Sequence, residues 1–411
     1  MSLFIRRARV LTLALPGSVP GAPVRPRRGP ALRELGLMPR ADIWIQGDKI
    51  SAVAPELPLP PDAEVIDADG RVLMPGFVDC HTHACAPSAP LDEWERALCG
   101  ATPSELEKDG GGLPAIIHAA RTATRKQLAA GLRLRLDALL RGGTTTVEVK
   151  SGLGLASEAE RKLLGAIQRA ASEWPGTVVP TATLGHAVEG EVAAFTRQIV
   201  REVLPEVWHE FPGLTIDARC APDAWPVEAC VRLLERARKH GLPVRVSADQ
   251  LAPTGMVPEA LTLHARSIDH LENASKADLL ALAASDTFAV FTPAASFHSG
   301  LRYARAGAFA DSGGLLALAS DHGPAACPIH AMPFVIALAV RHCGLTVAEA
   351  IVAATVNAAA MLGLADRGTI EPGRRADLLL LRHLDERQLA HEVGDNPVVR
   401  VICGGRTVFP S

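Results

Sequence analysis

The feature that most constrains the fold is a regular alternation of short apolar segments and helical segments after Pro75. Continuous apolar strands separated by helices are typical of a parallel sheet that is covered on both faces. The candidate strands lie at residues 77–79, 145–149, 178–183, 214–217, 244–246, 267–269, 288–292 and 315–320. Repeated strand–helix units over this length predict an α/β fold, a (β/α)₈ TIM-like barrel. No Gly-x-Gly-x-x-Gly follows any strand, which argues against a dinucleotide-binding fold.

The clearest helix between these strands is expected at residues 114–140. Its apolar side chains recur at spacings near 3.6 residues, and Gly142-Gly143 would end it. A second helix is expected to begin at Ser157, where Glu160 three residues later suggests a capping box.

Both ends of the chain are rich in turns and short strands instead. Residues 4–13 and 42–53 look like strands, the latter a hairpin around Gly47-Asp48, and similar patterns return at 376–381 and 398–408. We therefore expect a small β-sandwich domain built from residues 1–74 and 367–411, with the (β/α)₈ barrel at 75–366 inserted between them.

Composition narrows the possible partners and the compartment. Charged residues make up 21% of the 411 residues and the formal net charge is −3, so we expect no nucleic-acid partner and no anionic membrane surface. The apolar run after the first arginines is too short for a signal peptide and ends at Pro16. The eight cysteines show no paired zinc-ligand spacing. A cytoplasmic protein with reduced thiols is the expectation.

The strongest candidate for chemistry is a histidine pair at the end of the first barrel strand. His81 and His83 are two residues apart, so on a strand they face the same side and can hold one metal ion. With 14 histidines in 411 residues, such a pair arises by chance about once in two chains. Its place at a strand end, where barrel active sites lie, favours a metal site. His270, Asp321 and His186 follow other strands in the same way.

Several further motifs carry a family resemblance. They are Pro75-Gly76-Phe77-Val78-Asp79 with His81 and His83, Gly110-Gly111-Gly112 with Arg121-Thr122-Ala123, Thr144 to Gly152, Leu184-Gly185-His186-Ala187, Ala248-Asp249-Gln250-Leu251, Asp269-His270-Leu271-Glu272, Thr355 to Ala359, and Gly368 to Asp377. From about residue 70 onward the chain resembles the amidohydrolase superfamily and, within it, the imidazolonepropionase family, which opens a cyclic amide in histidine degradation.

The resemblance implies a metal-dependent hydrolase with a small-molecule substrate. His81, His83 and Asp321 would bind Zn²⁺ or Fe²⁺, which acidifies a water for attack on the ring carbonyl. Asp321 would also move the proton, and His270 would stabilise the oxyanion. Gln250, a catalytic candidate too, and His186 fall where the family contacts substrate. The family converts 4-imidazolone-5-propanoate to N-formimidoyl-glutamate and leads us to expect a homodimer.

The chain departs from the family pattern at positions that would line the site. Ser247 stands where the family has a metal-ligand histidine, and a neutral hydroxyl is a poor ligand. Leu153 replaces a tyrosine and Gly323 an asparagine, both at expected substrate-binding positions. His264 and His322 are candidates to replace the missing ligand.

A further departure affects recognition of the substrate's propionate. The family has an arginine shortly after the histidine pair, and Ala89-Pro90-Leu91 stands there instead. A guanidinium pairs well with a carboxylate, whereas proline has no donor.

These departures leave three alternatives to a true imidazolonepropionase. The chain could be a paralogue that opens another lactam, a deaminase of a heterocycle with the same metal chemistry, or a binding protein that has lost catalysis. Metal content, ammonia release and ring opening would separate them.

Overall fold

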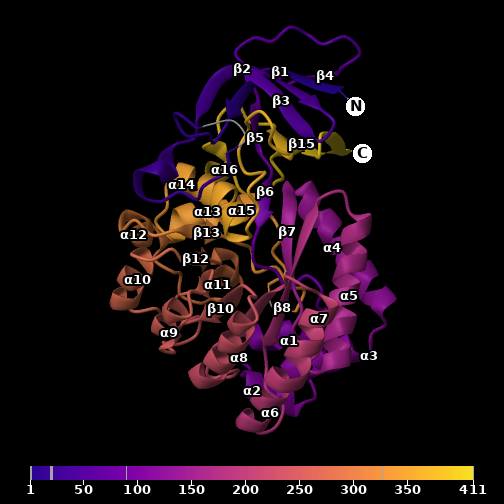
Figure 1. The fold of residues 1–411 in the computed structure, drawn as a ribbon, viewed down its shortest axis with the longest axis vertical. Coiled ribbons are helices and arrows are strands. Elements are labelled where there is room, and N and C mark those ends of the chain that lie inside the picture. The colour runs from indigo at the N-terminus through magenta and orange to yellow at the C-terminus, as the bar shows by residue number, and fades with distance from the viewer. Residues whose placement is uncertain (1, 19–21, 89, 326, 411) are drawn as a thin grey trace.

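The structure is a computed structural model that describes residues 2–18, 22–88, 90–325 and 327–410. Figure 1 shows a barrel surrounded by helices, with a smaller β region above it that holds both chain termini. Within the described residues no helix combines the length and the apolar character needed to cross a bilayer. All eight cysteines are free, and only Cys99 is exposed.

The barrel consists of eight parallel strands, each hydrogen-bonded to the next in chain order. They are β6 (Phe77–Asp79), β7 (Thr144–Lys150), β8 (Thr177–Gly185), β9 (Thr215–Arg219), β10 (Val244–Ala248), β11 (Ser267–His270), β12 (Phe288–Phe291) and β13 (Leu316–Leu318). Almost every strand residue is buried, as expected for strands covered by helices outside and side chains inside. The expected barrel is confirmed.

The seam between β6 and β13 is bridged just beyond the strand ends. The backbone N–H of Asp321 donates to the carbonyl of His81 at 3.1 Å, and the N–H of His83 donates to the carbonyl of His322 at 2.8 Å. The buried Asp79 carboxylate accepts a further bond from the N–H of Ser320 at 3.1 Å. The barrel is therefore nearly closed, and these bonds bring the first and last strands together at its carboxyl end.

Helices connect the strands and cover the outside of the barrel (Figure 1). They are α1 (Leu91–Leu98), α2 (Pro103–Lys108), α3 (Gly112–Thr122), α4 (Arg125–Arg141), α5 (Ser157–Glu173), α6 (Val192–Gln198), a π-turn (Ile199–Val203), α7 (Leu204–Glu210), α8 (Val227–Lys239), α9 (Met256–Thr262), α10 (Lys276–Ala283), α11 (Pro293–Ser299), α12 (Ala306–Asp311), α13 (Met332–His342), α14 (Val347–Ala353) and α15 (Val356–Met361). Apolar side chains of α3 through α15 share one core with the strands.

Two details of the helix predictions were wrong. The helix expected over 114–140 is two helices, because Thr124 leaves helical geometry and caps α4 in a capping box with Gln127. At α5 the N-cap is Ala156, and Ser157 makes no capping bond. The Glu160 carboxylate instead accepts hydrogen bonds from the N–H groups of Gly152, Gly154 and Leu155.

The chain ends form one continuous sheet, in the order β16-β15-β14-β5-β1-β2-β3 with β4 on β1. Its strands are β1 (Ser2–Leu11), β2 (Leu37–Gln46), β3 (Lys49–Ala54), β4 (Glu64–Asp67), β5 (Val72–Pro75), β14 (Leu378–Leu381), β15 (Val398–Cys403) and β16 (Arg406–Phe409), with a 3₁₀ turn at Gly29–Arg33 and α16 at Gln388–His391. Gly47-Asp48 is the expected hairpin turn between β2 and β3.

The small β domain expected from both ends of the chain is confirmed: its strands form one continuous sheet and share one core. Inward side chains of β1, β2 and β3 pack with those of β14 and β15 in one apolar cluster. Pairing of β5 with both β1 and β14 joins the N-terminal and C-terminal strands. The proposed division at residues 74/75 and 366/367 stays a prediction.

Candidate metal centre and active site

His81 and His83 follow β6 at the carboxyl end of the barrel. His81 is fully buried, and its Nδ1 is 2.6 Å from the Asp269 carboxylate at the end of β11. A carboxylate there fixes the tautomer and orientation of the ring, as second partners of metal-binding histidines do. The opposite nitrogen, Nε2, is buried and has no hydrogen-bond partner in the described part of the chain. It is therefore directed at a place that a cation would fill.

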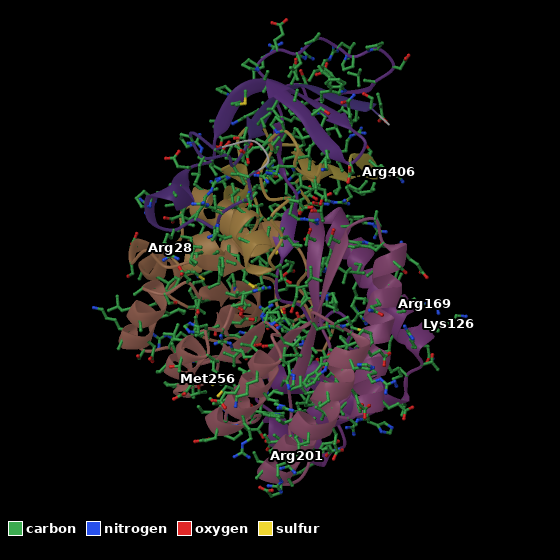
Figure 2. The ribbon with its side chains drawn as sticks, in the orientation of Figure 1. Arg28, Lys126, Arg169, Arg201, Met256 and Arg406 are labelled. Carbon is green, nitrogen blue, oxygen red and sulfur yellow. The ribbon has the colours of Figure 1, made fainter. Side chains whose placement is uncertain are left out.

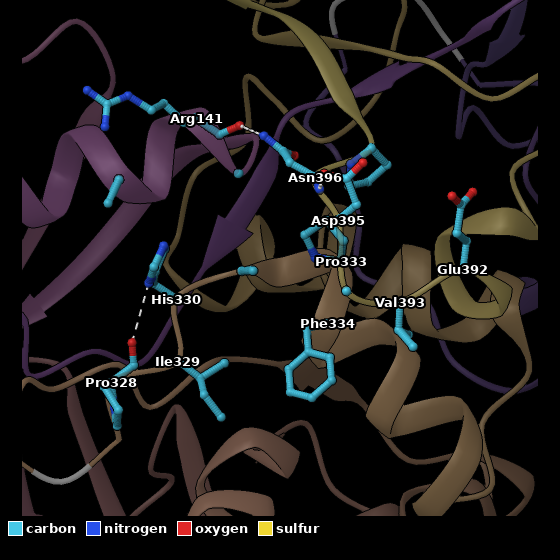
Figure 3. A pocket seen from close by; sticks show the side chains of 15 residues that line it. Arg141, Pro328, Ile329, His330, Pro333, Phe334, Glu392, Val393, Asp395 and Asn396 are labelled. Atoms are coloured by element: carbon cyan, nitrogen blue, oxygen red, sulfur yellow. Dashed lines mark hydrogen bonds between the residues drawn. The ribbon is translucent and has the colours of Figure 1, made fainter.

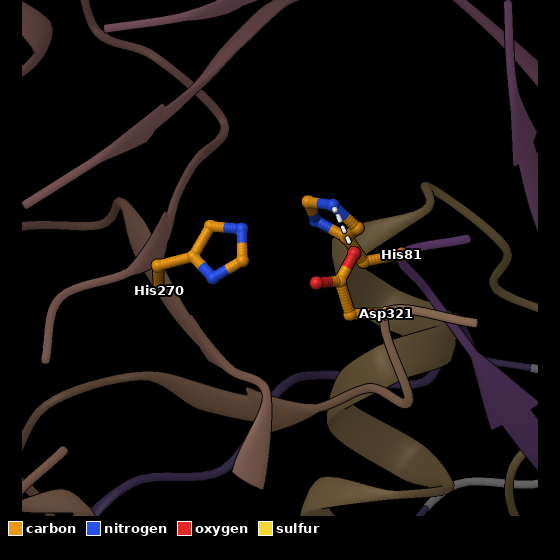
Figure 4. A group of neighbouring side chains, drawn as sticks. All are labelled: His81, His270 and Asp321. Carbon is orange, nitrogen blue, oxygen red and sulfur yellow. Dashed lines mark ion pairs between the residues drawn. The ribbon is translucent and has the colours of Figure 1, made fainter. Parts of the chain in front are cut away.

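His270 and Asp321 approach this nitrogen from β11 and from just after β13 (Figure 4). One ligand atom from each of His81, His270 and Asp321 lies within 4.8 Å of the other two. Asp321 Oδ1 is 3.4 Å from His81 Nε2 and 3.9 Å from His83 Nε2. The predicted ligands His81, His83 and Asp321 are brought together, and His270 lies close enough to join them.

Burial sets the protonation of these groups. Desolvation lowers the pKa of His81 and His83 well below the ordinary value, so both imidazoles are neutral, the form that binds a metal. Burial also raises the pKa of Asp321 to about 6, against the opposing effect of the nearby His270. For His270 burial lowers the pKa, but the hydrogen bond and charge of Glu272 outweigh it and raise the value. The donor set of neutral nitrogens and one carboxylate fits Zn²⁺ or Fe²⁺.

A network of buried charges lies beneath the histidines. Arg245 on β10 pairs with Asp269 and, at 3.1 Å, with Glu148 on β7. Lys150 is 2.5 Å from Asp217 on β9 and 3.5 Å from Glu148. All five side chains are almost fully buried. The network holds Asp269 in place, and through it the His81 ring.

A cavity of about 300 Å³ opens above the cluster. Its walls include the expected substrate-contacting residues His186, Gln250, His270, Leu153 and Gly323, together with Ser247 and the candidate ligands His83 and Asp321. His186 is half-buried, desolvation and the charge of Arg219 lower its pKa to about 3, and its buried Nδ1 has no partner among described groups. The cavity thus unites residues from seven barrel strands or their following loops.

The two suggested replacements for the missing ligand lie elsewhere. His264 lines a cavity with Pro243 and Phe288 at the amino-terminal end of β10 and β12, away from the cluster. His322 turns its ring toward His330, with a centroid distance of 5.7 Å. The structure supports neither suggestion, because His264 lies at the amino-terminal end of the barrel and the His322 ring faces His330. Ala89, one residue of the substituted segment, lies outside the described residues, and Pro90 and Leu91 are exposed.

Sequence reasoning missed three contributors to the site. Asp217 and Arg219, two residues apart on β9, both line the cavity, and Asp223 in the following loop lines it too. Charged residues at the end of a predicted strand were the available signal, since barrel sites collect such residues.

A second cavity of about 690 Å³ lies between the end of α4, α13 and residues 392–397 (Figure 3). The side chain of His330 faces it, with Nδ1 3.3 Å from the Pro328 carbonyl, and Asn396 donates to the Arg141 carbonyl. Among the described residues, the side chains grouped closely enough to bind a metal ion lie at the mouth of the barrel, not in this second cavity.

Comparison with known proteins defines the class. A sequence profile of the amidohydrolase family matches residues 72–408. The atrazine chlorohydrolase of Arthrobacter aurescens TC1, solved with zinc, has a similar fold, with a TM-score of 0.72 over 99% of this chain and 95% of that one at 17% identity. The chain belongs to the amidohydrolase family and is a hydrolytic enzyme that acts on C–N bonds.

Its sequence relatives narrow the family further. The imidazolonepropionase of Symbiobacterium thermophilum is 40% identical over 397 residues, covering 93% of each chain. That of Deinococcus radiodurans is 37% identical over 380 residues, covering 92% of this chain and 95% of the relative. The imidazolonepropionase-like resemblance is confirmed over nearly the whole length.

Proposed function

We propose that this enzyme opens the ring of 4-imidazolone-5-propanoate by metal-dependent hydrolysis and releases N-formimidoyl-glutamate. The observation that carries the proposal is the convergence of His81, His270 and Asp321, with His83 Nε2 3.9 Å from Asp321, beneath a cavity sized for a small ligand. A cavity near the lower end of the usual 300–1,000 Å³ range suits a single five-membered ring with a short side chain.

His81, His83 and Asp321 would hold the ion, with His270 adjacent. A bound Zn²⁺ or Fe²⁺ would supply Lewis acidity and lower the pKa of a coordinated water toward about 7. The identity of the ion is left to experiment, because both metals accept nitrogen and carboxylate ligands.

The chain's own side chains would then move protons and stabilise charge. Asp321, at the edge of the cavity, accepts the proton from the attacking water and returns it to the ring nitrogen that leaves. His270 is braced by Thr292, 3.0 Å from its Nδ1, and presents its other nitrogen to the developing oxyanion. Gln250 and His186, on the cavity wall, orient the ring through hydrogen bonds.

Product analysis tests this proposal. The natively purified enzyme is incubated with 4-imidazolone-5-propanoate, and the products are followed by mass spectrometry and an ammonia assay. We expect N-formimidoyl-glutamate without free ammonia, and a loss of at least about 10³-fold in kcat for Asp321→Asn, the proton acceptor and ligand. Release of ammonia at the initial rate would instead identify a deaminase.

A protein that binds but does not turn over a panel of cyclic amides, with metal present, would favour the non-catalytic alternative. Ser247 is the specific observation behind that alternative, because it lines the cavity where a further ligand is expected. Homodimer formation, expected from the family, and a cytoplasmic location, expected from the composition, remain predictions.

A further inference from the structure

Arg219 is the only arginine or lysine among the described residues that line the active-site cavity. It is the last residue of β9, on the same face as Asp217, and pairs in register with Ser247 on β10. The buried cations nearby are committed elsewhere, Lys150 to Asp217 at 2.5 Å and Arg245 to Glu148 and Asp269. Among the described arginines and lysines, Arg219 alone therefore brings a positive charge to the wall of the active-site cavity.

The guanidinium of Arg219 has hydrogen-bonding capacity to spare. Its bonds to other described residues run from Nη2 alone, to both carboxylate oxygens of Asp223 at 3.0 and 2.9 Å. Its side chain is 20% exposed, whereas that of Asp223 is 55% exposed. Asp223 therefore holds the guanidinium from the solvent side, and the remaining N–H donors stay available to an anion from the cavity.

His186 shares this part of the wall. The positive charge of Arg219 contributes to the lowered pKa of His186, which keeps that imidazole neutral. Its buried Nδ1 lacks a partner among the described residues. An anionic group entering here would meet a charged donor from Arg219 beside a neutral histidine with unused capacity, and the acidic groups Asp217 and Asp223 are already paired.

We propose that Arg219 is the residue that binds the carboxylate of the substrate side chain, so that the enzyme selects cyclic amides that carry an acidic tail. This inference rests on the proposed function, and it places the carboxylate at the β9 side of the cavity. It gives the chain an anion-binding residue although Pro90 and Leu91 stand where the family has its arginine.

Binding of a stable ligand pair tests the inference without turnover. Imidazole-4-propanoate and its neutral amide are titrated into the full-length protein by calorimetry. We expect the wild-type protein to prefer the acid, and Arg219→Gln to lose about 10- to 100-fold of the affinity for the acid while binding the amide unchanged. Equal affinity of the wild type for acid and amide, or an unchanged preference in Arg219→Gln, would overturn the inference.

Two further variants separate a lost charge from a damaged structure. Asp223→Asn breaks the same ion pair but keeps the cation, so it should retain the preference for the acid. If Asp223→Asn loses that preference as Arg219→Gln does, the ion pair rather than the cation matters and the inference fails. Arg201→Gln removes an exposed arginine at the periphery, labelled in Figure 2, and should change neither affinity.

The same variants distinguish the two proposals. Ring opening with equal kcat/KM for wild type and Arg219→Gln on the acid would retain the proposed function and reject the role of Arg219. If the wild type prefers the acid ligand through Arg219 but opens no ring, the role of Arg219 would be retained and the proposed function rejected.

Discussion

Asp321 and His270 reach the centre of the site through backbone conformations that few residues adopt. Both have positive φ values, 56° and 79°. Non-glycine residues in that region cost free energy and are concentrated at functional sites. The unusual turn rotates each side chain away from the direction that regular strand alternation would give it, and toward His81.

The backbone at Ser247 directs its side chain into the cavity, but a serine hydroxyl is a poor metal ligand. Ser247→His should raise the affinity for Zn²⁺ by about tenfold or more, because imidazole is a far better zinc donor than a hydroxyl. Competition against a chelator of known affinity measures the change.

Ser247→Ala is the matched control and should leave zinc affinity within about twofold, since a neutral hydroxyl contributes little as a ligand. Equal affinities for the wild type, Ser247→His and Ser247→Ala would show that residue 247 does not face the ion.

Some residues of the site could be predicted from the sequence and others could not. His81, His83, His270 and Asp321 could be predicted because each follows an apolar strand, and parallel strands bring their carboxyl ends together. Arg219 was missed although it follows the predicted strand at 214–217, because a place at a strand end does not by itself show that a guanidinium borders the cavity.

Among the elements, the loop between β7 and α5 depends on one carboxylate. Glu160 is fully buried in the first turn of α5 and accepts bonds from the N–H groups of Gly152, Gly154 and Leu155. The loop carries Leu153 into the cavity wall. The sequence signal at Glu160 was real, but it predicted a cap for the helix rather than an anchor for the loop before it.

Glu160→Ala should therefore lower the free energy of unfolding by about 3 kcal/mol, since it leaves buried N–H donors without acceptors. It should also raise KM, because the loop that carries Leu153 loses its anchor. Urea denaturation and steady-state kinetics measure the two effects.

Glu158→Ala is the control, because Glu158 lies two residues before Glu160 in the same helix turn but is exposed. It should change the free energy of unfolding by less than about 0.5 kcal/mol. A similar loss for both variants would indicate an effect on the helix end rather than on the loop.

At the scale of the molecule, the candidate metal site lies across the barrel seam. His81 and His83 follow the first strand and Asp321 follows the last, where backbone bonds already bridge the gap. The alternation of strands and helices predicted this architecture from sequence. It could not predict that the terminal strands form one continuous sheet, because pairing between residues hundreds of positions apart leaves no local pattern.

A metal bound across the seam should stabilise the whole barrel. Free zinc at about 1,000 times its dissociation constant would add about 4 kcal/mol to the free energy of unfolding. Thermal unfolding before and after chelation should show a lower Tm for the metal-free protein and recovery when zinc returns. An equal response in Asp321→Asn would mean that the stabilising ion binds somewhere else.

Metal titration of the metal-free enzyme tests the central claim most directly. Zn²⁺ or Fe²⁺ is added stepwise while ring opening of 4-imidazolone-5-propanoate is recorded. We predict that activity rises linearly and reaches a plateau at about one ion per chain, and that Asp321→Asn stays inactive throughout. Full activity without metal, or no ring opening at any metal concentration, would contradict the account.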